Sequence, residues 1–485
     1  MTSSTTARPV LRWDARTWGA LVVLCGALFL DGLDVSMVGM ALPSIRTDLH
    51  LSTSSLQWIV SGYVLGYGGL LLLGGRAADL LGRRRVFLAA LAVFAAASLL
   101  GGVVSSPGLL IATRFIKGVA AAFTAPAGLS IITTTFAEGP ARNRALSIYT
   151  ACGASGFSMG LILGGLLTEV GWRWTFLLPV PIALAAFVAG RILIADDGRP
   201  DREGRGYDLA GAVTATGAML LLVYAVVQAP TVGWVTARTL LSFAGVIALL
   251  VAFVVTEQRT THPLVRLGIL RSGALTRANI GAMTMFGSYI GFQFVGTLYL
   301  QSMLHWSPVK TALAFLPAGA LVAFGAPQVG RLADRIGTSR VLVAGSLAFA
   351  IGYPLALRFN PAPNYAVIIL PTILLLGVGF GLSFPSLNIQ ATAGVADHEQ
   401  GLASGLLNTS IQIGGAIVLA IVTAVVSSGG GQQSNADLLG SYHNAIAVVT
   451  GVAVLGLVVA LSGLISRRRP ILESALVEEP VLVET

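Results

Sequence analysis

The sequence has 485 residues, of which 55% are hydrophobic and only 11% are charged, and its mean hydropathy is +0.82. Soluble proteins carry about 25% charged residues, so a water-soluble enzyme is excluded as the first interpretation. The net charge of +9 is spread through short loops and is not gathered among aromatic residues on one polar surface, which argues against a nucleic-acid-binding protein.

Fourteen apolar stretches follow one another along the chain, and each is about as long as the 20 residues that a helix needs to cross a hydrocarbon core. They span residues 18–40, 55–75, 86–104, 108–133, 144–168, 174–194, 208–228, 239–256, 278–300, 311–330, 340–357, 366–389, 402–426 and 444–465. An unpaired strand cannot cross lipid, because its backbone groups would lack partners. We therefore predict an all-α polytopic membrane protein with 14 transmembrane helices.

The cationic residues test this helix count, because consecutive loops must alternate between the two sides of the membrane. The termini and the even-numbered loops hold 23 of the 30 Lys and Arg residues, the odd-numbered loops hold five, and the remaining two lie inside the fourth stretch. Loops rich in Lys and Arg face the cytoplasm. Both termini are therefore predicted to be cytoplasmic, for a multi-pass protein of the plasma or inner membrane.

An internal repeat follows the second and tenth stretches. The segments Gly75-Arg-Ala-Ala-Asp79-Leu-Leu-Gly82 and Gly330-Arg-Leu-Ala-Asp334-Arg-Ile-Gly337 share glycine, arginine, alanine, aspartate and glycine at the same offsets. The repeat indicates two six-helix bundles, with the seventh and eighth helices inserted between them. Parallel repeats are typical of transporters, whose substrates bind between the halves near the middle of the bilayer.

This organisation divides the chain into seven parts. They are a cytoplasmic N-terminus 1–17, an N-terminal bundle 18–194, a cytoplasmic linker 195–207, two inserted helices 208–256, a second linker 257–277, a C-terminal bundle 278–465 and a cytoplasmic tail 466–485. Neither the first linker nor the tail has enough apolar residues to build a catalytic domain.

Four ionisable residues lie deep within predicted helices: Asp31 and Asp34 in the first, and Arg114 and Lys117 in the fourth. A carboxylate at the bilayer centre costs about 2.5 to 3.5 kcal/mol on insertion scales, so such residues are functional candidates. Each pair is three residues apart and shares a helix face. Depth in the membrane can be counted from the outer ends of the two helices, at about 1.5 Å per residue. By this count Asp34 lies at the depth of Arg114, and Asp31 at the depth of Lys117, which suggests two ion pairs.

These pairs suggest how protons drive transport. Burial favours the neutral form of a carboxyl group and a neighbouring cation favours the charged form, so a bound cationic substrate can decide whether the proton stays. The membrane potential contributes about 2.3 kcal/mol per charge per 100 mV, which sustains a roughly fortyfold gradient. Alternatively, the four charges only hold the two helices together. Replacing Asp34 by Asn should abolish proton-driven efflux and leave folding intact.

Several short motifs occur in a specific order along the first half. They are Leu33-Asp34 through Ala41-Leu42-Pro43, the first Gly-Arg-x-Ala-Asp segment, Arg114 with Gly118, Gly160 with Gly164 and Gly165, and Trp172-Arg173-Trp174-Thr-Phe176 with Val180-Pro181, and the second Gly-Arg-x-Ala-Asp segment adds to them in the second half. With these motifs the chain resembles the major facilitator superfamily over nearly its full length, and within it the 14-helix drug:proton antiporters, including actinobacterial-type antibiotic and multidrug efflux transporters. The resemblance implies the major facilitator fold, in which the first and fourth helices line the central cavity.

The resemblance also implies roles for single residues. The family motif has its aspartate at Asp34 and commonly glutamine at Lys117, which favours Asp34 with Arg114 for proton coupling over the extra pair of Asp31 and Lys117. The repeated segments correspond to gating loops that fasten the cytoplasmic side in the outward-open state, with Gly75, Asp79, Gly82, Arg83, Gly330, Asp334 and Gly337 as candidates. Alternatively, Arg83 serves only as a topological charge.

The fifth helix carries a row of glycines, Gly156, Gly160, Gly164 and Gly165, that lets helices approach closely. Ordinary tight packing explains this row as well as an antiporter motif does. The antiporter version usually has proline where this chain has Leu161, and this difference weakens the motif as an indication of antiport.

The predicted C-terminal bundle has no deep charge, so its side of the cavity should be apolar with amide and hydroxyl groups. Helical spacing groups Phe286, Tyr289 and Gln293 in the ninth helix, and Ser404, Asn408 and Gln412 in the thirteenth. Such a surface suits a bulky amphipathic or aromatic substrate, although aromatic rows in a bundle also serve packing alone.

We predict a secondary active transporter, not an enzyme, that exports amphipathic drugs or antibiotics in exchange for protons. The sequence has no GxxxxGK[ST] phosphate loop and no histidines at metal-binding spacing, so we expect no cofactor and no metal. The expected partners are a small amphipathic substrate, protons and the lipid bilayer, for a monomer that binds no nucleic acid. Two alternatives remain: a proton-coupled transporter of a native metabolite, such as a siderophore, an amino acid or another nutrient, and a non-transporting membrane sensor.

Overall fold

The computed structural model describes residues 13–136, 140–196, 209–260, 268–269, 272–325, 328–393, 395, 400–427 and 435–466, and its regular structure there is entirely helical. In chain order the helices are α1 (Ala15–Asp48), α2 (Thr53–Leu81), α3 (Arg83–Val103), α4 (Pro107–Thr135), α5 (Pro140–Val170), α6 (Trp174–Leu177), α7 (Pro179–Leu193), α8 (Leu209–Val232), α9 (Ala237–Arg259), α10 (Gly273–Leu298), η2 (Tyr299–Met303), α11 (Pro308–Gly325), α12 (Val329–Ile336), α13 (Thr338–Leu355), η4 (Ala356–Arg358), η5 (Tyr365–Ile369), α14 (Leu370–Thr392), α15 (Gln400–Ser427) and α16 (Asn435–Ser466). The all-α prediction is confirmed for these residues.

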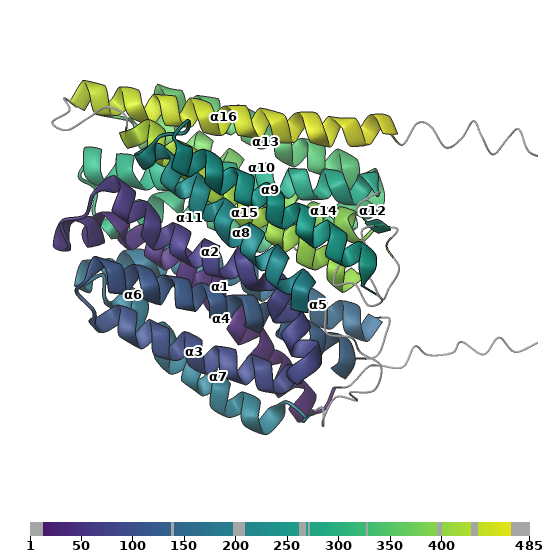
Figure 1. Cartoon of the computed structure of the whole chain (residues 1–485). Helices are drawn as coiled ribbons and strands as arrows, with labels where there is room; N and C mark the ends of the chain where they lie inside the picture. Colours follow the sequence, from purple (N-terminus) through teal and green to yellow (C-terminus); the bar gives the residue numbers. More distant parts are fainter. Residues whose placement is uncertain are drawn as a thin grey trace, which may run out of the picture.

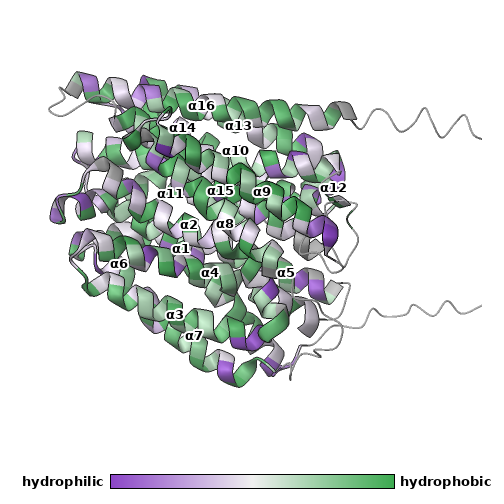
Figure 2. Ribbon diagram, viewed as in Figure 1, coloured by the Kyte–Doolittle hydropathy of each residue, from purple (hydrophilic) through white to green (hydrophobic). Residues whose placement is uncertain are grey.

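Most helices run from one side of the bundle to the other (Figure 1), with hydrophobic residues along their central lengths and many of the polar residues near their ends (Figure 2). Within the described ranges, 12 helical segments are long and apolar enough to cross a membrane, when α6 and α7 count as one. Two further helices, α2 and α10, are not among these 12. With 29 and 26 residues they are as long as the helices that are. The structure is thus consistent with the fourteen predicted crossings.

Both ends of the described chain lie on one side of the bundle, since α1 begins and α16 ends there (Figure 1). We call this side the terminal face and the opposite side the distal face. On the terminal face, Arg84 forms an ion pair with Asp196 at 3.4 Å. On the distal face, Arg173 forms one with Asp48 at 3.0 Å. Charged side chains therefore occupy both rims of the bundle, where water and lipid headgroups can solvate them.

The helices form two groups, which we call the N-terminal group (α1 to α7) and the C-terminal group (α10 to α16). In the first, α1 packs along α5 and α2 along α4; in the second, α10 packs along α15 and α13 along α14. The groups meet where α5 lies against α11 and α2 against α15. The helix α8 packs on both α2 and α15, and α9 packs on α8. The exact domain boundaries stay a prediction. The first predicted linker falls largely outside the described residues, whereas the second overlaps the end of α9 and the start of α10.

The repeated Gly-Arg-x-Ala-Asp segments are helical, so the prediction that they form loops is wrong. Residues 75–81 form the end of α2, and residues 330–336 lie in the short helix α12. Only the last glycine of each segment turns the chain: Gly82 has φ 97° and ψ 126°, and Gly337 has φ 89° and ψ 137°. Similar backbone angles at equivalent positions agree with the internal repeat, and they require glycine because L side chains rarely adopt such φ values.

Replacing Gly337 by Ala should destabilise the protein by about 1 to 3 kcal/mol, the typical cost of a strained backbone conformation. Gly330→Ala is the matched control, because Gly330 lies inside α12 and a methyl group there would meet nothing within 4 Å among the described residues beyond its own helix backbone and chain neighbours. The apparent melting temperature of the purified protein in detergent measures both effects. Equal melting temperatures for the two variants would contradict the role of this turn.

Candidate transport site

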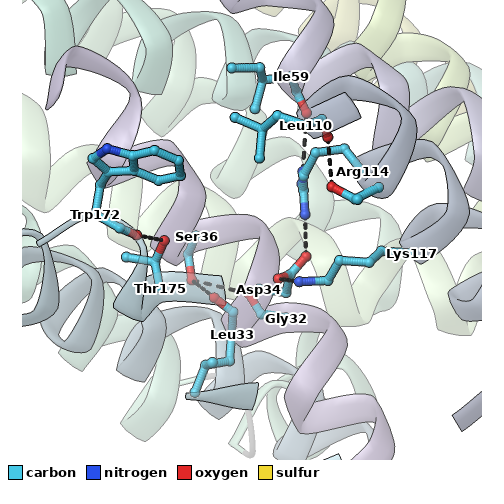
Figure 3. Close-up of polar contacts among 11 residues, drawn as sticks. Gly32, Leu33, Asp34, Ser36, Ile59, Leu110, Arg114, Lys117, Trp172 and Thr175 are labelled. Carbon is cyan, nitrogen blue, oxygen red and sulfur yellow. Dashed lines mark hydrogen bonds and ion pairs between the residues drawn. The ribbon is translucent and has the colours of Figure 1, made fainter. Parts of the chain in front are cut away.

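Asp34 lies at the centre of a buried charge cluster between α1 and α4 (Figure 3). Its two carboxylate oxygens meet different cations, since Arg114 Nη1 donates to Oδ2 and Lys117 Nζ donates to Oδ1. The three side chains are at most 2% exposed. None of these charges is therefore solvated by bulk water, and each depends on its partner for stabilisation.

Both cations make further contacts within the N-terminal group. Arg114 Nε donates to the backbone carbonyl of Ile59 in α2 at 3.1 Å, and its guanidinium carbon lies 4.6 Å from the centre of the Tyr63 ring. Lys117 Nζ lies 4.9 Å from the centre of the Phe94 ring in α3. Aromatic faces stabilise desolvated cations, so the cluster joins α1, α2, α3 and α4.

The pairing of Asp31 with Lys117 that the sequence suggested is wrong. Lys117 contacts Asp34, and Asp31 forms no ion pair within the described residues. Asp31 is 7% exposed, and its Oδ2 is buried without a hydrogen-bond partner in that part of the chain. A lysine side chain is as long as one helical turn, about 5.4 Å, so counting levels along two helices does not decide which of two acids it reaches.

The cluster contains most of the buried charge in the described ranges. The charged residues buried there are Asp31, Asp34, Arg114, Lys117 and Glu257, and Glu257 lies close to the end of α9. All four residues chosen from the sequence are thus buried. Their part in proton coupling stays a prediction.

Glycines in α5 set its distance from α1. A methyl group on Gly156, Gly160 or Gly164 would lie 2.2, 2.5 or 2.7 Å from backbone atoms of α1, too close for any side chain. The fourth glycine, Gly165, faces the other group, because its methyl would lie 2.8 Å from the Pro308 carbonyl in α11. The glycine row therefore packs α5 between α1, which carries both acids, and the C-terminal group.

The remaining residues of the repeated segments lie at or near the terminal face. Asp334 and Gly330 are exposed on α12, and Arg83 is half-buried at the start of α3. A methyl group on Gly75 would make ordinary contact with Pro126 of α4, at 3.6 Å. The side chain of Asp79 lies outside the described residues. A gating role for these residues stays a prediction.

Aromatic side chains meet across the two groups. The Tyr289 ring of α10 lies 5.8 Å from the Phe157 ring of α5 and 4.8 Å from the Phe380 ring of α14. Sequence spacing identified Tyr289 but not its two partners, because they lie on other helices and carry no motif of their own.

Two predicted amides of the C-terminal group face the N-terminal group. Gln293 lies against Gly39 of α1: a methyl group added to Gly39 would stand 3.3 Å from Gln293 Nε2. Gln412 lies against Gly68 of α2: a methyl group added to Gly68 would stand 2.8 Å from Gln412 Cβ. By contrast, Asn408 donates to the Ser404 carbonyl of its own helix.

The aromatic ring of Phe286 packs within the C-terminal group, 3.3 Å from where a methyl group on Gly415 of α15 would stand. The six predicted cavity residues therefore divide: Tyr289, Gln293 and Gln412 lie between the groups, whereas Phe286, Ser404 and Asn408 make contacts within the C-terminal group.

Hydrogen bonds join the two groups near the distal face. Gln301 Nε2 donates to the Met40 carbonyl at 3.2 Å, and the Val309 backbone N–H donates to Glu169 Oε1 at 3.4 Å. The sequence did not predict these contacts. Two of the four groups involved are backbone atoms, which every residue has, so residue types do not indicate them.

The comparisons with known proteins agree with this architecture. Residues 24–419 match the model of the Major Facilitator Superfamily. The puromycin resistance protein pur8 of Streptomyces alboniger is 38% identical over 92% of this chain and 91% of its own length, and the cephamycin export protein CmcT of Amycolatopsis lactamdurans is 39% identical over 91% of each.

Solved structures show the same fold at low sequence identity. The crystal structure of the POT family transporter PepTSo has a TM-score of 0.66 and 17% identity, and it aligns over 94% of this chain and 99% of its own. The nucleoside transporter NupG, solved as a D323A mutant, has a TM-score of 0.64 at 13% identity over 92% and 99% of the two chains. The chain therefore belongs to the Major Facilitator Superfamily and is a multi-pass membrane transporter, not an enzyme.

Proposed function

We propose that this chain is a secondary active exporter, which moves amphipathic organic molecules, antibiotics among them, out of the cytoplasm in exchange for protons. The observation that carries the proposal is the buried cluster of Asp31, Asp34, Arg114 and Lys117 in α1 and α4. Helices that only pack against one another in lipid need no ionisable side chains at this depth, and such residues mark ion and proton pathways.

Relatives and cavity chemistry support the substrate class. The names of the two relatives refer to puromycin resistance and to cephamycin export, and each covers about nine-tenths of this chain. In this chain Tyr289, Phe157 and Phe380 supply an aromatic surface between the groups, and Gln293 and Gln412 supply amides nearby. Aromatic surface with a few polar groups is typical of sites for bulky organic ligands.

The orientation of the chain follows from its charge. The predicted cytoplasmic loops carry most of the Lys and Arg residues, so the terminal face lies in the cytoplasm. Contacts of Gln301 with Met40 and of Glu169 with Val309 close the distal face, which supports a state loaded from the cytoplasm. We expect a monomer in the plasma membrane, driven by the proton gradient alone.

A susceptibility panel tests this function. An efflux-deficient bacterial host that expresses the chain should grow at several-fold higher concentrations of at least one compound among puromycin, lincomycin, a cephamycin and ethidium than the same host with an empty vector. In everted vesicles, adding that compound should dissipate a preformed pH gradient, because each inward-moving substrate releases protons. Identical growth on every compound would favour a native metabolite as substrate, and no proton movement with any compound would favour a sensor.

A further inference from the structure

We propose that Asp31, and not Asp34, carries the exchanged proton, and that ionised Asp31 is the counter-charge for a monovalent organic cation. This inference rests on the proposed function and deepens it. It gives the two acids different tasks, and it fixes both the charge of the preferred substrate and the number of protons exchanged for it.

Asp34 is held in its ionised form by its contacts. Each of its oxygens accepts a hydrogen bond from a different cation, and the side chain has no exposed surface. Protonation would break one of these contacts and would leave Arg114 and Lys117 buried beside a neutral group, which is strongly unfavourable. Asp34 therefore serves as the fixed anion of the cluster.

Asp31 has the opposite environment, one helical turn nearer the terminal face. Its carboxyl group is buried, and Oδ2 has no hydrogen-bond partner within the described residues. The cation expected to pair with it, Lys117, is engaged by Asp34. An isolated carboxyl group in an apolar interior takes up a proton instead of remaining charged. Asp31 is thus the acid of the cluster that is free to exchange a proton.

The groups around Asp31 suit an organic cation. Among the described residues, those that interact electrostatically with it include Asp34 on α1, Lys117 on α4, Tyr63 and Tyr67 on α2, and Tyr149 on α5. The Tyr63 and Tyr67 rings lie 5.8 Å apart, and the Tyr63 hydroxyl is buried without a partner in the described ranges. A carboxylate among aromatic rings attracts a monovalent organic cation by charge and by cation–π contact.

The charge balance of the cluster then determines how many protons are exchanged for each substrate cation. With Asp31 protonated, the cluster of two cations and one ionised acid carries one net positive charge. When the O–H bond of Asp31 breaks and the proton leaves to the cytoplasm, the cluster becomes neutral, and a bound monovalent cation restores the single positive charge. The proton-loaded and substrate-loaded states thus carry equal charge, so a one-for-one exchange is electroneutral. One pH unit would sustain about a tenfold substrate gradient at any membrane potential.

Infrared difference spectroscopy tests the proton site without any substrate. In lipid nanodiscs near neutral pH, where exposed acids are ionised, the wild-type protein should show the C=O band of a protonated carboxyl group that disappears at alkaline pH. Asp31→Asn should lack this band and still elute as a folded protein, because Asn replaces a neutral group of the same size. Asp196→Asn, which removes an exposed acid on the terminal face, should keep it. A band that persists in Asp31→Asn, or a wild-type protein without one, overturns the assignment.

Transport in proteoliposomes tests the coupling, with ethidium as the monovalent cation. A pH gradient of one unit should concentrate ethidium about tenfold in wild type and in Asp196→Asn, equally with and without an imposed potassium diffusion potential, and Asp31→Asn should lose this accumulation. Proton-driven accumulation by Asp31→Asn, or a wild-type gradient that changes with the imposed potential, contradicts the inference. If wild type moves no compound of the susceptibility panel against a pH gradient, the proposed function fails, and the infrared result still decides where the proton binds.

Discussion

Asp34→Asn is expected to prevent stable folding, because it leaves two buried cations without an anion. Arg114 and Lys117 each donate a hydrogen bond to this one carboxylate. Removing one partner of a buried ion pair costs about 3 to 5 kcal/mol, a large part of the total stability of a protein, which is about 5 to 15 kcal/mol. Size-exclusion elution after heating, measured on protein in detergent, should show little folded Asp34→Asn. The contacts of Asp34 thus lead to a different expectation from the sequence alone, which predicted that folding would survive this change.

Two variants separate this effect from a general effect of losing an acid or a charge. Asp48→Asn removes an aspartate from the same helix whose ion pair with Arg173 is half-exposed, and exposed pairs contribute about 0 to 1 kcal/mol. Lys117→Gln leaves Asp34 paired with Arg114 and replaces the second cation by a neutral group. Both should keep most of the wild-type heat stability. If Asp34→Asn is as heat-stable as Asp48→Asn, the buried cations do not depend on Asp34.

Hydropathy located most of the membrane helices but not where they begin, end or break. The first apolar stretch covers residues 18–40, whereas α1 extends over Ala15–Asp48, because polar residues continue a helix beyond the lipid core. The stretch 174–194 is interrupted at Leu178, since α6 ends at Leu177 and α7 begins at Pro179; proline lacks the N–H that a continuous helix would use. The length of an apolar stretch reflects the thickness of the hydrocarbon core around it. It therefore does not define where the helix begins or ends.

The depth of the charges could be predicted from the sequence, but their partners could not. A charged residue in an apolar run must be buried between helices. This predicts that Asp31, Asp34, Arg114 and Lys117 lie inside the bundle at similar depths. Which acid receives which cation depends on helix tilt, rotation and side-chain rotamers, and none of these appears in residue spacing. The prediction that the repeated Gly-Arg-x-Ala-Asp segments form loops was wrong for a related reason. Glycine is common inside membrane helices, so Gly75 does not indicate a loop.

Gly160→Ala is expected to separate α1 from α5 and to reduce both stability and transport. A methyl group on Gly160 would lie 2.1 Å from Ser36 Oγ and 2.5 Å from the Leu33 carbonyl. Backbone atoms cannot move aside as a side-chain end can, so α1 itself must shift, and overpacking of this kind costs about 1 to 3 kcal/mol. Leu33 directly precedes Asp34, and the shift therefore displaces the carboxylate that Arg114 and Lys117 share.

Gly26→Ala is the matched control on α1, since in the described part of the chain a methyl group on Gly26 would meet nothing within 4 Å beyond its own helix backbone and chain neighbours. In a helix interior this change should be neutral or should stabilise by about 0.5 to 1 kcal/mol. Apparent melting temperature and proton-driven efflux, measured together for both variants, should fall for Gly160→Ala and stay near wild type for Gly26→Ala. A Gly160→Ala protein that melts normally but no longer transports would show that close packing of α1 serves the exchange cycle more than stability. Normal melting and normal efflux would contradict the close approach of α1 and α5 at this position.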